Sequence, residues 1–476
     1  MKILLILALL LPVNAWSNDP NYDSATRIVT FPRVTIDNDT AYTNLQLLLP
    51  PHDAWKILTA TPENTGVTQS LNPFEEIRLS VDLSQFNGRA EYDLSPSAKN
   101  ELTLESSGLT ITKVTLDNNL LPFSIYNGDL QLRLLEAARH LVVDYTFALA
   151  APFQGLFNNG AVTFTWPDFC RNLFPCLSSP EFGTRNQLQL TGIADGKTAV
   201  YPTQLSAKAP AYQLAWAVGD YVYQQLGITD AGTRVSLWTL ANHSVAISTG
   251  LAKLPWVINW LEKTLGPYPF GDNVASVEVD WSNNNATGME HHPYWHIETT
   301  AFDNPRIHIH EAIHGWFGNG IRIACWEDFV FLEGLASYLT AVAAGAIYGA
   351  EEEASIWLNY ETLLHSAIQR HNPIVWPEGC GQVNVSEIFT ITTYMKGAFF
   401  FRALEQKVGR ETLLAALSVF YRQHQGEAVT FGQLLDTLKQ HTQFDPWPLA
   451  QAWLRSVHCP VVRLKLLAHS NGSCEY

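Results

Sequence analysis

The sequence predicts an α+β protein in which a β-rich N-terminal half precedes an α-rich half. The chain has 476 residues, enough for two or three domains. As far as about residue 227, short runs of β-branched and aromatic residues alternate with turn residues, which is typical of antiparallel strands. Beyond residue 304, apolar residues recur at helical spacing. We therefore expect a β-rich domain at residues 16–227 and an α-rich domain that begins at residue 228.

The first residues, 1–15, have the pattern of a secretory signal peptide. Lys2 provides a basic start, residues 3–13 are apolar, and Val13 and Ala15 form a small-residue cleavage site. The apolar run is too short to span a bilayer, and no cysteine follows the cleavage site to carry a lipid. We expect no second apolar run of membrane-spanning length. The mature protein is therefore expected to be secreted or periplasmic, without a membrane anchor.

The composition is that of an acidic protein with a large core. Hydrophobic residues make up 47% of the chain and the formal net charge is −16, so nucleic acid and anionic membranes are disfavoured as partners. The six cysteines permit three disulfides in an exported protein. A Cys459–Cys474 pair is favoured because it would tie down the C-terminal tail, and free buried thiols are the alternative.

Individual elements follow from apolar spacing and from the turn residues between the runs. Strands are predicted at residues 27–31, 102–106, 110–116, 140–147, 186–193, 235–240 and 275–281. Helices are predicted at residues 251–266, 306–318, 328–347, 354–370, 395–408, 411–425, 431–441 and 447–456. The α-rich domain is thus expected to begin with a small sheet.

The stretch HEAIHGWFGN, residues 310–319, places ionisable side chains in an apolar segment. His310 and His314 are four apart and share one face of a predicted helix, where two imidazoles can bind one zinc ion. Glu311 would project beside the metal and act as general base on a water molecule. Because so short a motif arises by chance, two histidines held by ordinary hydrogen bonds are the competing interpretation.

A third candidate ligand, Glu333, stands in the next predicted helix, EDFVFLEGLASYL at 327–339. Eighteen residues separate it from His314, and its neighbours are apolar. An unpaired carboxylate among them would be costly, and a bound metal explains its presence. Asp328 is either a hydrogen-bond partner of a ligating histidine or an acid favoured by the helix N-terminus.

Together these motifs resemble the aminopeptidase N family of zinc metallopeptidases, whose relatives include leukotriene hydrolase. The resemblance runs from about residue 160 to residue 464 in the family's order, whereas the first 150 residues match poorly. Besides HEAIHGWFGN and LEGLASYL, it rests on FCRNLFPC (169–176), NATGMEHH (285–292), TYMKGAFFFRALEQKVG (393–409) and CPVVRL (459–464).

The resemblance implies a saddle-like N-terminal β domain and a thermolysin-like catalytic domain at residues 228–464, with a tail at 465–476. It also implies a short form without the helical C-terminal domain of larger relatives, and one Zn2+ per chain. The implied functional residues are the zinc ligands His310, His314 and Glu333, the base Glu311, the oxyanion donor Tyr394, and the substrate contacts Gly288, Met289 and Glu290.

Two departures from the family pattern concern the substrate's ammonium group. The family's Gly-Ala-Met-Glu-Asn strand reads TGMEH here, at residues 287–291. Trp166 stands where the family places a glutamine or glutamate, and it offers a cation only a π face. We therefore include Trp166 among the substrate contacts. Asp168 is a nearby substitute acceptor or, alternatively, a turn aspartate.

Other residues near these motifs have alternative interpretations. Tyr394 packed under Phe399 is the alternative to a catalytic tyrosine, and Lys396 is expected to be a structural or surface charge. The histidines at 291–296 and His308 suggest a second metal, but strand histidines that line a pocket or pair with carboxylates are the favoured interpretation.

The expected function is that of an exported zinc metallopeptidase, an aminopeptidase acting on peptides. Because Trp166 lacks an acceptor for the amine, a zinc endopeptidase or dipeptidase-like enzyme that tolerates blocked N-termini is the alternative. A catalytically dead peptide-binding protein is the third interpretation. Such a protein would be expected to lose Glu311 or Tyr394, and both are present.

Overall fold

The structure is a computed structural model that divides into two compact units, Met1–Ser70 and Leu71–Tyr476. It describes residues 72–96, 101–134, 138–158, 160–241, 250–281, 286–370, 373–380 and 383–457, together with the backbone of strands at 21–23, 28–35, 41–48, 56–62, 468–470 and 473–475. The predicted signal peptide at 1–15 and the side chains of Cys459 and Cys474 lie outside the described residues.

The first unit contains a four-stranded sheet in the order β1-β2-β3-β4. Its strands are β1 (Asn21–Asp23), β2 (Ile28–Thr35), β3 (Ala41–Leu48) and β4 (Lys56–Pro62), and each pairs antiparallel with the next. The range 16–227, predicted as one β-rich domain, therefore includes a sheet that belongs to a separate unit.

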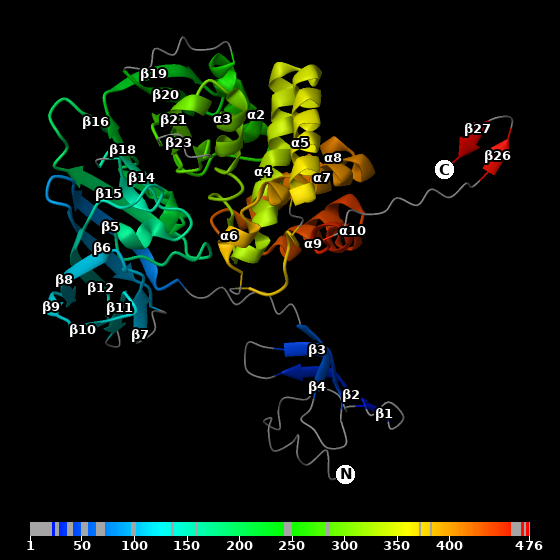
Figure 1. Ribbon diagram of the computed structural model, residues 1–476, viewed down its shortest axis with the longest axis horizontal. Coiled ribbons are helices and arrows are strands. Elements are labelled where there is room, and N and C mark those ends of the chain that lie inside the picture. The colour runs from blue at the N-terminus through cyan, green and yellow to red at the C-terminus, as the bar shows by residue number, and fades with distance from the viewer. Residues whose placement is uncertain are drawn as a thin grey trace. The chain divides into compact units, whose positions relative to one another are not determined.

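The second unit opens with a seven-stranded sheet in the order β17-β15-β5-β6-β12-β8-β9 (Figure 1). Its strands are β5 (Phe74–Asp82), β6 (Asn87–Leu94), β8 (Leu109–Leu116), β9 (Asn119–Leu120), β12 (His140–Phe147), β15 (Thr184–Thr191) and β17 (Gln204–Ala209). Every second residue of β15 is buried, as expected for a sheet with one face on the core. β15 and β5 are parallel, so this mostly antiparallel sheet contains one parallel pair.

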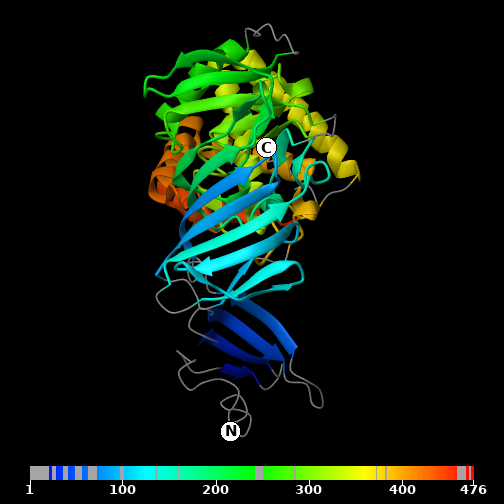
Figure 2. The ribbon, with the colours of Figure 1, turned by 90° about the vertical axis from the view of Figure 1, so that its left-hand side faces the viewer.

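Two smaller sheets accompany it (Figure 2). The first has the order β10-β11-β7, with β7 (Glu101–Leu104), β10 (Phe123–Tyr126) and β11 (Asp129–Arg133). The second has the order β13-β14-β18-β16, with β13 (Gly155–Phe157), β14 (Val162–Phe164), β16 (Thr198–Val200) and β18 (Ala217–Gly219). Trp166 lies two residues after the end of β14.

The α-rich part begins with a five-stranded sheet in the order β19-β20-β21-β23-β22. Its strands are β19 (Tyr221–Ile228), β20 (Arg234–Leu240), β21 (Asn273–Val279), β22 (Gly288–Met289) and β23 (Tyr294–Glu298). The boundary predicted at residue 227 falls inside β19. Because β19 pairs with β20, the whole strand belongs to this sheet, which therefore begins at Tyr221. The short strand β22 lies at the edge of the sheet and pairs antiparallel with β23.

Helices predominate in the rest of the chain. They are α2 (Leu254–Thr264), α3 (Pro305–Ile313), α4 (Phe329–Tyr348), α5 (Ala350–Arg370), α6 (Val385–Ile388), α7 (Ile391–Val408), α8 (Arg410–His424), α9 (Phe431–Thr442) and α10 (Trp447–Leu454). Short strand pairs join β24 (Arg322–Ile323) to β25 (Ala428–Val429) and β26 (Ala468–Ser470) to β27 (Ser473–Glu475). The predicted helices are present, and the predicted α+β fold with a β-rich part before a helical part is confirmed.

Helix α4 is the buried centre of the helical part. Among the described residues, the segment Trp326–Tyr348 is long and apolar enough to cross a membrane, so the expectation of no second such run is wrong. Most of its apolar window, 83%, is nevertheless buried inside the protein, as in the core helix of a globular domain. Helix α7 packs on α4 with Gly397 against Gly334, where a Cβ on Gly334 would overlap the Gly397 backbone. This close backbone contact fixes the position of α7 against α4.

Two disulfides occur among the described cysteines. Cys170 pairs with Cys176, with a Cα–Cα distance of 6.2 Å, and Cys325 pairs with Cys380 at 5.5 Å. The second bond joins the residues just before α4 to a loop 55 positions further along the chain. The favoured pair Cys459–Cys474 stays a prediction.

Candidate active site

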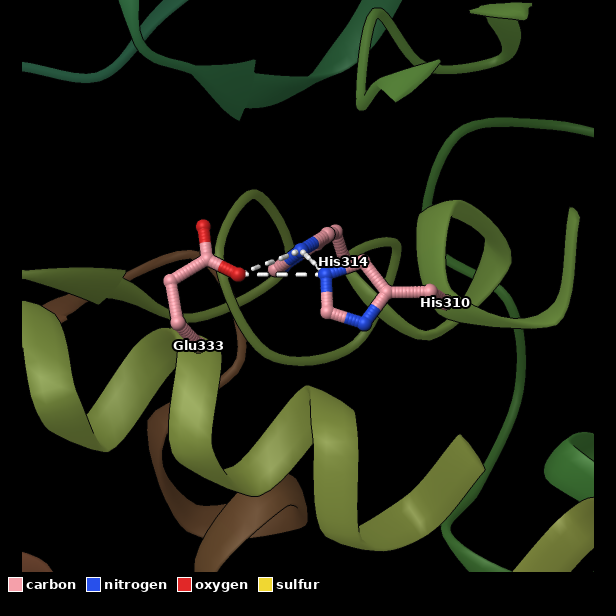
Figure 3. Close-up of side chains that lie close together, drawn as sticks. All are labelled: His310, His314 and Glu333. Atoms are coloured by element: carbon pink, nitrogen blue, oxygen red, sulfur yellow. Dashed lines mark hydrogen bonds and ion pairs between the residues drawn. The ribbon is translucent and has the colours of Figure 1, made fainter. Parts of the chain in front are cut away.

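Three predicted ligand atoms converge between α3 and α4. The Nε2 atoms of His310 and His314 lie 3.2 Å apart, and an Oε2 atom of Glu333 lies 3.1 Å from the first and 3.5 Å from the second (Figure 3). α3 begins with Pro305 and is capped by Asn304, whose side chain accepts a hydrogen bond from the Arg306 N–H. It ends at Ile313, earlier than predicted, with His314 as its C-cap.

These separations are those of metal ligands. Ligand atoms at about 2.0–2.1 Å from a tetrahedral zinc ion lie roughly 3.3 Å from one another. Two imidazole nitrogens and one carboxylate oxygen are a familiar zinc donor set, and three protein ligands leave one position open for water or substrate. The side chains of His314 and Glu333 are also buried, with 1% and 6% of their surfaces exposed. The residues present therefore fit a zinc ion.

The tautomer of His314 is set by the chain that follows α3. Its Nδ1 atom lies 3.0 Å from the Phe317 carbonyl oxygen and donates to it, which leaves the Nε2 lone pair for a metal. Asp328 stands at the N-cap position of α4, which agrees with the second of the two roles considered for it, an acid at a helix N-terminus. Its side chain makes no cap hydrogen bond to α4; its carboxylate accepts hydrogen bonds from the Trp376 indole at 2.8 Å and the Phe431 N–H at 3.0 Å. Burial raises the pKa of Asp328 to about 6.

Glu311 lies beside the ligands and directly under β22, which carries the expected substrate contacts Gly288 and Met289 and is called the substrate strand below. A Cβ on Gly288 would overlap the Glu311 carboxylate, so β22 crosses this side chain as closely as a glycine permits. Ligand atoms of Glu311, Glu290 and His314 all lie within 4.8 Å of one another. Burial raises the pKa of Glu311 well above its usual range, His314 opposes the shift, and the Glu290 carboxylate adds to it.

Glu290 is a second buried carboxylate, with 5% of its surface exposed. Burial raises its pKa to about 7, because the carboxylate has exchanged water for an apolar cavity wall. Its backbone is fixed to the segment after α3 by Asn319, whose Nδ2 donates to the Glu290 carbonyl oxygen at 2.5 Å. Two residues after Glu290, His292 has its Nδ1 atom 2.7 Å from the Tyr268 hydroxyl and its Nε2 atom 2.7 Å from the Glu311 carbonyl oxygen.

No role was predicted for Asn319 or Tyr268, and His292 was expected to line a pocket or pair with a carboxylate. In the structure, His292 bonds to Tyr268 and to the α3 backbone, and Asn319 bonds to the Glu290 backbone. Asn319 is the last residue of HEAIHGWFGN. Its polar side chain at the end of a largely apolar segment was the only feature of the sequence that could have indicated a structural role for it. The partners of His292 lie 19 and 24 positions away, on α3 and in a loop.

Tyr394 lies in the first turn of α7, where Thr390 caps the helix through the Thr393 N–H. Its ring stacks on that of His310, with the centroids 6.0 Å apart and the planes at 25°. Its other aromatic neighbours are Phe329 and Phe389, not Phe399 as in the packing alternative. Burial raises the pKa of Tyr394 well above 10, and nearby carboxylates raise it further. The phenol therefore stays protonated and is a hydrogen-bond donor.

The predicted residues share one cavity of about 540 Å³. It is lined by all nine of them, namely Trp166, Gly288, Met289, Glu290, His310, Glu311, His314, Glu333 and Tyr394. Trp166 and Phe389 form an aromatic part of its wall, with their ring centroids 4.8 Å apart, and Trp166 also packs on Phe329 at 5.9 Å. Asp168 is absent from the lining of this cavity among the described residues, and its carboxylate pairs with Arg171 at 2.8 Å.

The remaining polar residues near the motifs have structural partners. Lys396 is buried and donates to the Ser456 carbonyl oxygen at 3.0 Å. The His308 ring lies 2.7 Å from both the Ser276 hydroxyl and the Phe302 carbonyl oxygen. Because both ring nitrogens have hydrogen-bond partners, His308 is a core histidine rather than a second metal ligand, and burial lowers its pKa to about 4.

Comparison with known proteins agrees with this geometry. Residues 291–453 match the family described as "Peptidase family M1 domain". The rice Aminopeptidase M1-D (Oryza sativa subsp. japonica) is 23% identical over 452 residues, which cover 83% of this chain and 51% of that protein. Aminopeptidase N of Lactococcus lactis subsp. lactis is 21% identical over 421 residues, covering 77% of this chain and 49% of that protein. The chain thus spans about half the length of these relatives.

Solved structures show the same fold. The M1 zinc metallopeptidase from Deinococcus radiodurans superposes with a TM-score of 0.68 at 16% identity, covering 82% of this chain and 95% of that chain. The aminopeptidase A of Legionella pneumophila superposes with a TM-score of 0.69 at 15% identity, covering 80% of this chain and 49% of that one. Residues 291–453 therefore match peptidase family M1, and the resemblance to the aminopeptidase N family of zinc metallopeptidases is confirmed.

Proposed function

We propose that this protein is a zinc-dependent aminopeptidase that removes N-terminal residues from peptides. The observation that carries the proposal is the grouping of three metal-ligand atoms with two further buried carboxylates, Glu311 and Glu290, in one cavity. Zinc supplies a Lewis acid that polarises a carbonyl group and lowers the pKa of water. The curated relatives named as aminopeptidases support the same assignment.

Each residue of the site has a separate task in peptide hydrolysis. Glu311 accepts a proton from the attacking water and returns it to the leaving amine. Tyr394 donates a hydrogen bond to the carbonyl oxygen as negative charge develops there, which stabilises the transition state more than the bound substrate. The edge strand β22, with Gly288 and Met289, offers its backbone for pairing with an extended peptide.

Glu290 supplies the preference for a free N-terminus. A carboxylate whose pKa is raised by burial gains most from a cation placed beside it, and an α-ammonium group is that cation. Because Glu290 lies within 4.8 Å of Glu311, the ammonium group is held next to the carbonyl that is attacked. The enzyme therefore cuts after the first residue.

An enzyme that tolerates blocked or internal peptide bonds is the second candidate. Trp166 favours it, because the indole lines the cavity and brings no acceptor to share the ammonium group with Glu290. A peptide-binding protein without catalysis is disfavoured, since Glu311 and Tyr394 both face the cavity.

We also propose that the protein is exported. The signal-peptide pattern of residues 1–15 supports this, and so do the disulfides Cys170–Cys176 and Cys325–Cys380, which persist in oxidising compartments. N-terminal sequencing of the native protein from the culture medium or periplasm is expected to begin at Trp16. A native protein that keeps residues 1–15 would contradict export by cleavage.

Replacement of the general base tests the mechanism. Glu311→Gln removes the proton acceptor and leaves the three ligands, so zinc content should stay at one ion per chain while kcat falls about 100-fold or more. Zinc is counted by elemental analysis, and kcat is measured on an aminoacyl p-nitroanilide. Turnover that is undiminished by this change would sink the mechanism.

Paired peptides with free or acetylated N-termini separate the two candidate functions. The zinc-loaded protein is expected to remove single residues from the free peptides only, as read by mass spectrometry. If acetylated peptides are also cut, as the second candidate predicts, Trp166→Glu, which adds a carboxylate to the cavity that Glu290 lines, should raise the free-to-acetylated ratio of kcat/KM, whereas Trp166→Phe, which keeps a ring, should not. Equal cleavage of the acetylated peptides by the unaltered protein would favour the second candidate.

A further inference from the structure

The cavity extends beyond the residues that the proposed mechanism uses. One end is walled by α3 and α5, with Arg306 and Ile307 on the first helix and Asn359, Tyr360 and Leu363 on the second. Among the described residues that line the cavity, Arg306 is the only lysine or arginine. The cavity therefore contains one cationic side chain that has no part in metal binding or in water activation.

The charges of the cavity are ordered along α3. Arg306, His310 and His314 follow one another at intervals of four residues, which places them on one face of the helix about 6 Å apart along its axis. Glu290 is grouped with Glu311 and His314, at the C-terminal end of α3. The Arg306 backbone lies at the opposite end of α3, one turn before His310, and its guanidinium bonds to Glu352 and Ser355 of α5. Glu290 and Arg306 thus lie on opposite sides of the metal ligands along α3.

The guanidinium of Arg306 is held in place by α5. Its Nε donates to a Glu352 carboxylate oxygen at 2.6 Å, and its Nη2 donates to the Ser355 hydroxyl at 3.0 Å. The arginine side chain is 29% exposed. Arginine has five N–H donors in a fixed plane, and the hydrogen bonds described for Arg306 do not use Nη1. A second acceptor can therefore bind without displacing Glu352.

We propose that Arg306 binds the α-carboxylate of a short peptide, so that the site selects dipeptides and tripeptides with both termini free. The inference rests on the proposed aminopeptidase function and names its substrate class. An ammonium group beside Glu290 and a carboxylate beside Arg306 match the two charged ends of such a peptide. The guanidinium fork is suited to a carboxylate, which it binds through paired hydrogen bonds.

The spacing along α3 limits the length of the peptide. In an extended chain each residue adds about 3.3–3.6 Å. The terminal carboxylate therefore lies roughly 3.5 Å beyond the cleaved carbonyl in a dipeptide and roughly 7 Å beyond it in a tripeptide. Along the axis of α3, the Cα atoms of Arg306 and His310 are separated by about 6 Å, four residues at 1.5 Å each. A pentapeptide carries its carboxylate past the arginine, where the charge is no longer recognised.

The test compares free acids with C-terminal amides on the zinc-loaded protein. The probes are Tyr-Ala, Tyr-Ala-Ala and Tyr-Ala-Ala-Ala-Ala, each as acid and amide, with tyrosine p-nitroanilide as a substrate that has no carboxylate. The acid is expected to exceed the amide in kcat/KM by about tenfold or more for the dipeptide or tripeptide. For the pentapeptide the ratio should be close to one.

Two variants distinguish carboxylate binding from a contact between helices. Arg306→Gln should bring the acid-to-amide ratio of the short peptides close to one. Glu352→Gln breaks the same ion pair but keeps the cation, so it should retain the ratio. Because acid and amide are compared within each variant, a general loss of activity does not alter the ratio, and zinc content reports that the site is formed.

Three outcomes would overturn the inference in different ways. Equal rates for short acids and amides, with tyrosine p-nitroanilide still hydrolysed, would reject carboxylate recognition and leave the proposed function intact. An equal loss of the ratio in Arg306→Gln and Glu352→Gln would assign the effect to the contact between α3 and α5. No hydrolysis of any probe by the zinc-loaded protein would reject the aminopeptidase function itself, and with it the inference.

Discussion

The burial of negative charge between α3 and α4 is the constraint on which the rest of the site depends. Glu333, Glu311 and Glu290 are each 5–6% exposed and line the same cavity. Carboxylates removed from water destabilise a protein by several kcal/mol each unless cations or donors compensate them. In the proposed function, a metal ion at Glu333 and a substrate ammonium group at Glu290 are the compensating charges. The same burial of charge would then account for both the cofactor and the orientation of the substrate.

The scaffold holds these charges at fixed distances through backbone contacts. The close contact between Gly397 and Gly334 positions α7 against α4. Gly334 follows Glu333 directly, and Gly397 stands three residues after Tyr394. His292 and Asn319 hold the end of the substrate strand against α3 and the segment that follows it. The residues proposed as metal ligand, base, oxyanion donor and amine acceptor therefore come from elements that contact one another closely, as transition-state stabilisation requires.

The sequence predicted those features that depend on short spacings. Two histidines four apart share a helix face, and a carboxylate in an apolar helix needs a partner, so the metal ligands follow from local rules. The hydrogen-bond partners of Asp328 could not be predicted in this way, because Trp376 and Phe431 are 48 and 103 positions away. No prediction was made for Arg306, because its partners Glu352 and Ser355 are 46 and 49 positions away. By length and composition alone, α4 could be taken for a membrane-spanning helix, and its burial inside the protein is visible only in the structure.

The dependence of the folded state on a cation at Glu333 tests this account most directly. The protein is stripped of metal by a chelator, and Tm is measured with and without a small excess of zinc. The account predicts that zinc raises Tm by roughly 3 °C or more. This rise should be lost in Glu333→Gln and kept in Glu105→Gln, which changes a half-buried carboxylate in the β-rich part. A zinc-dependent rise of equal size in Glu333→Gln, or none in the unaltered protein, would contradict the account.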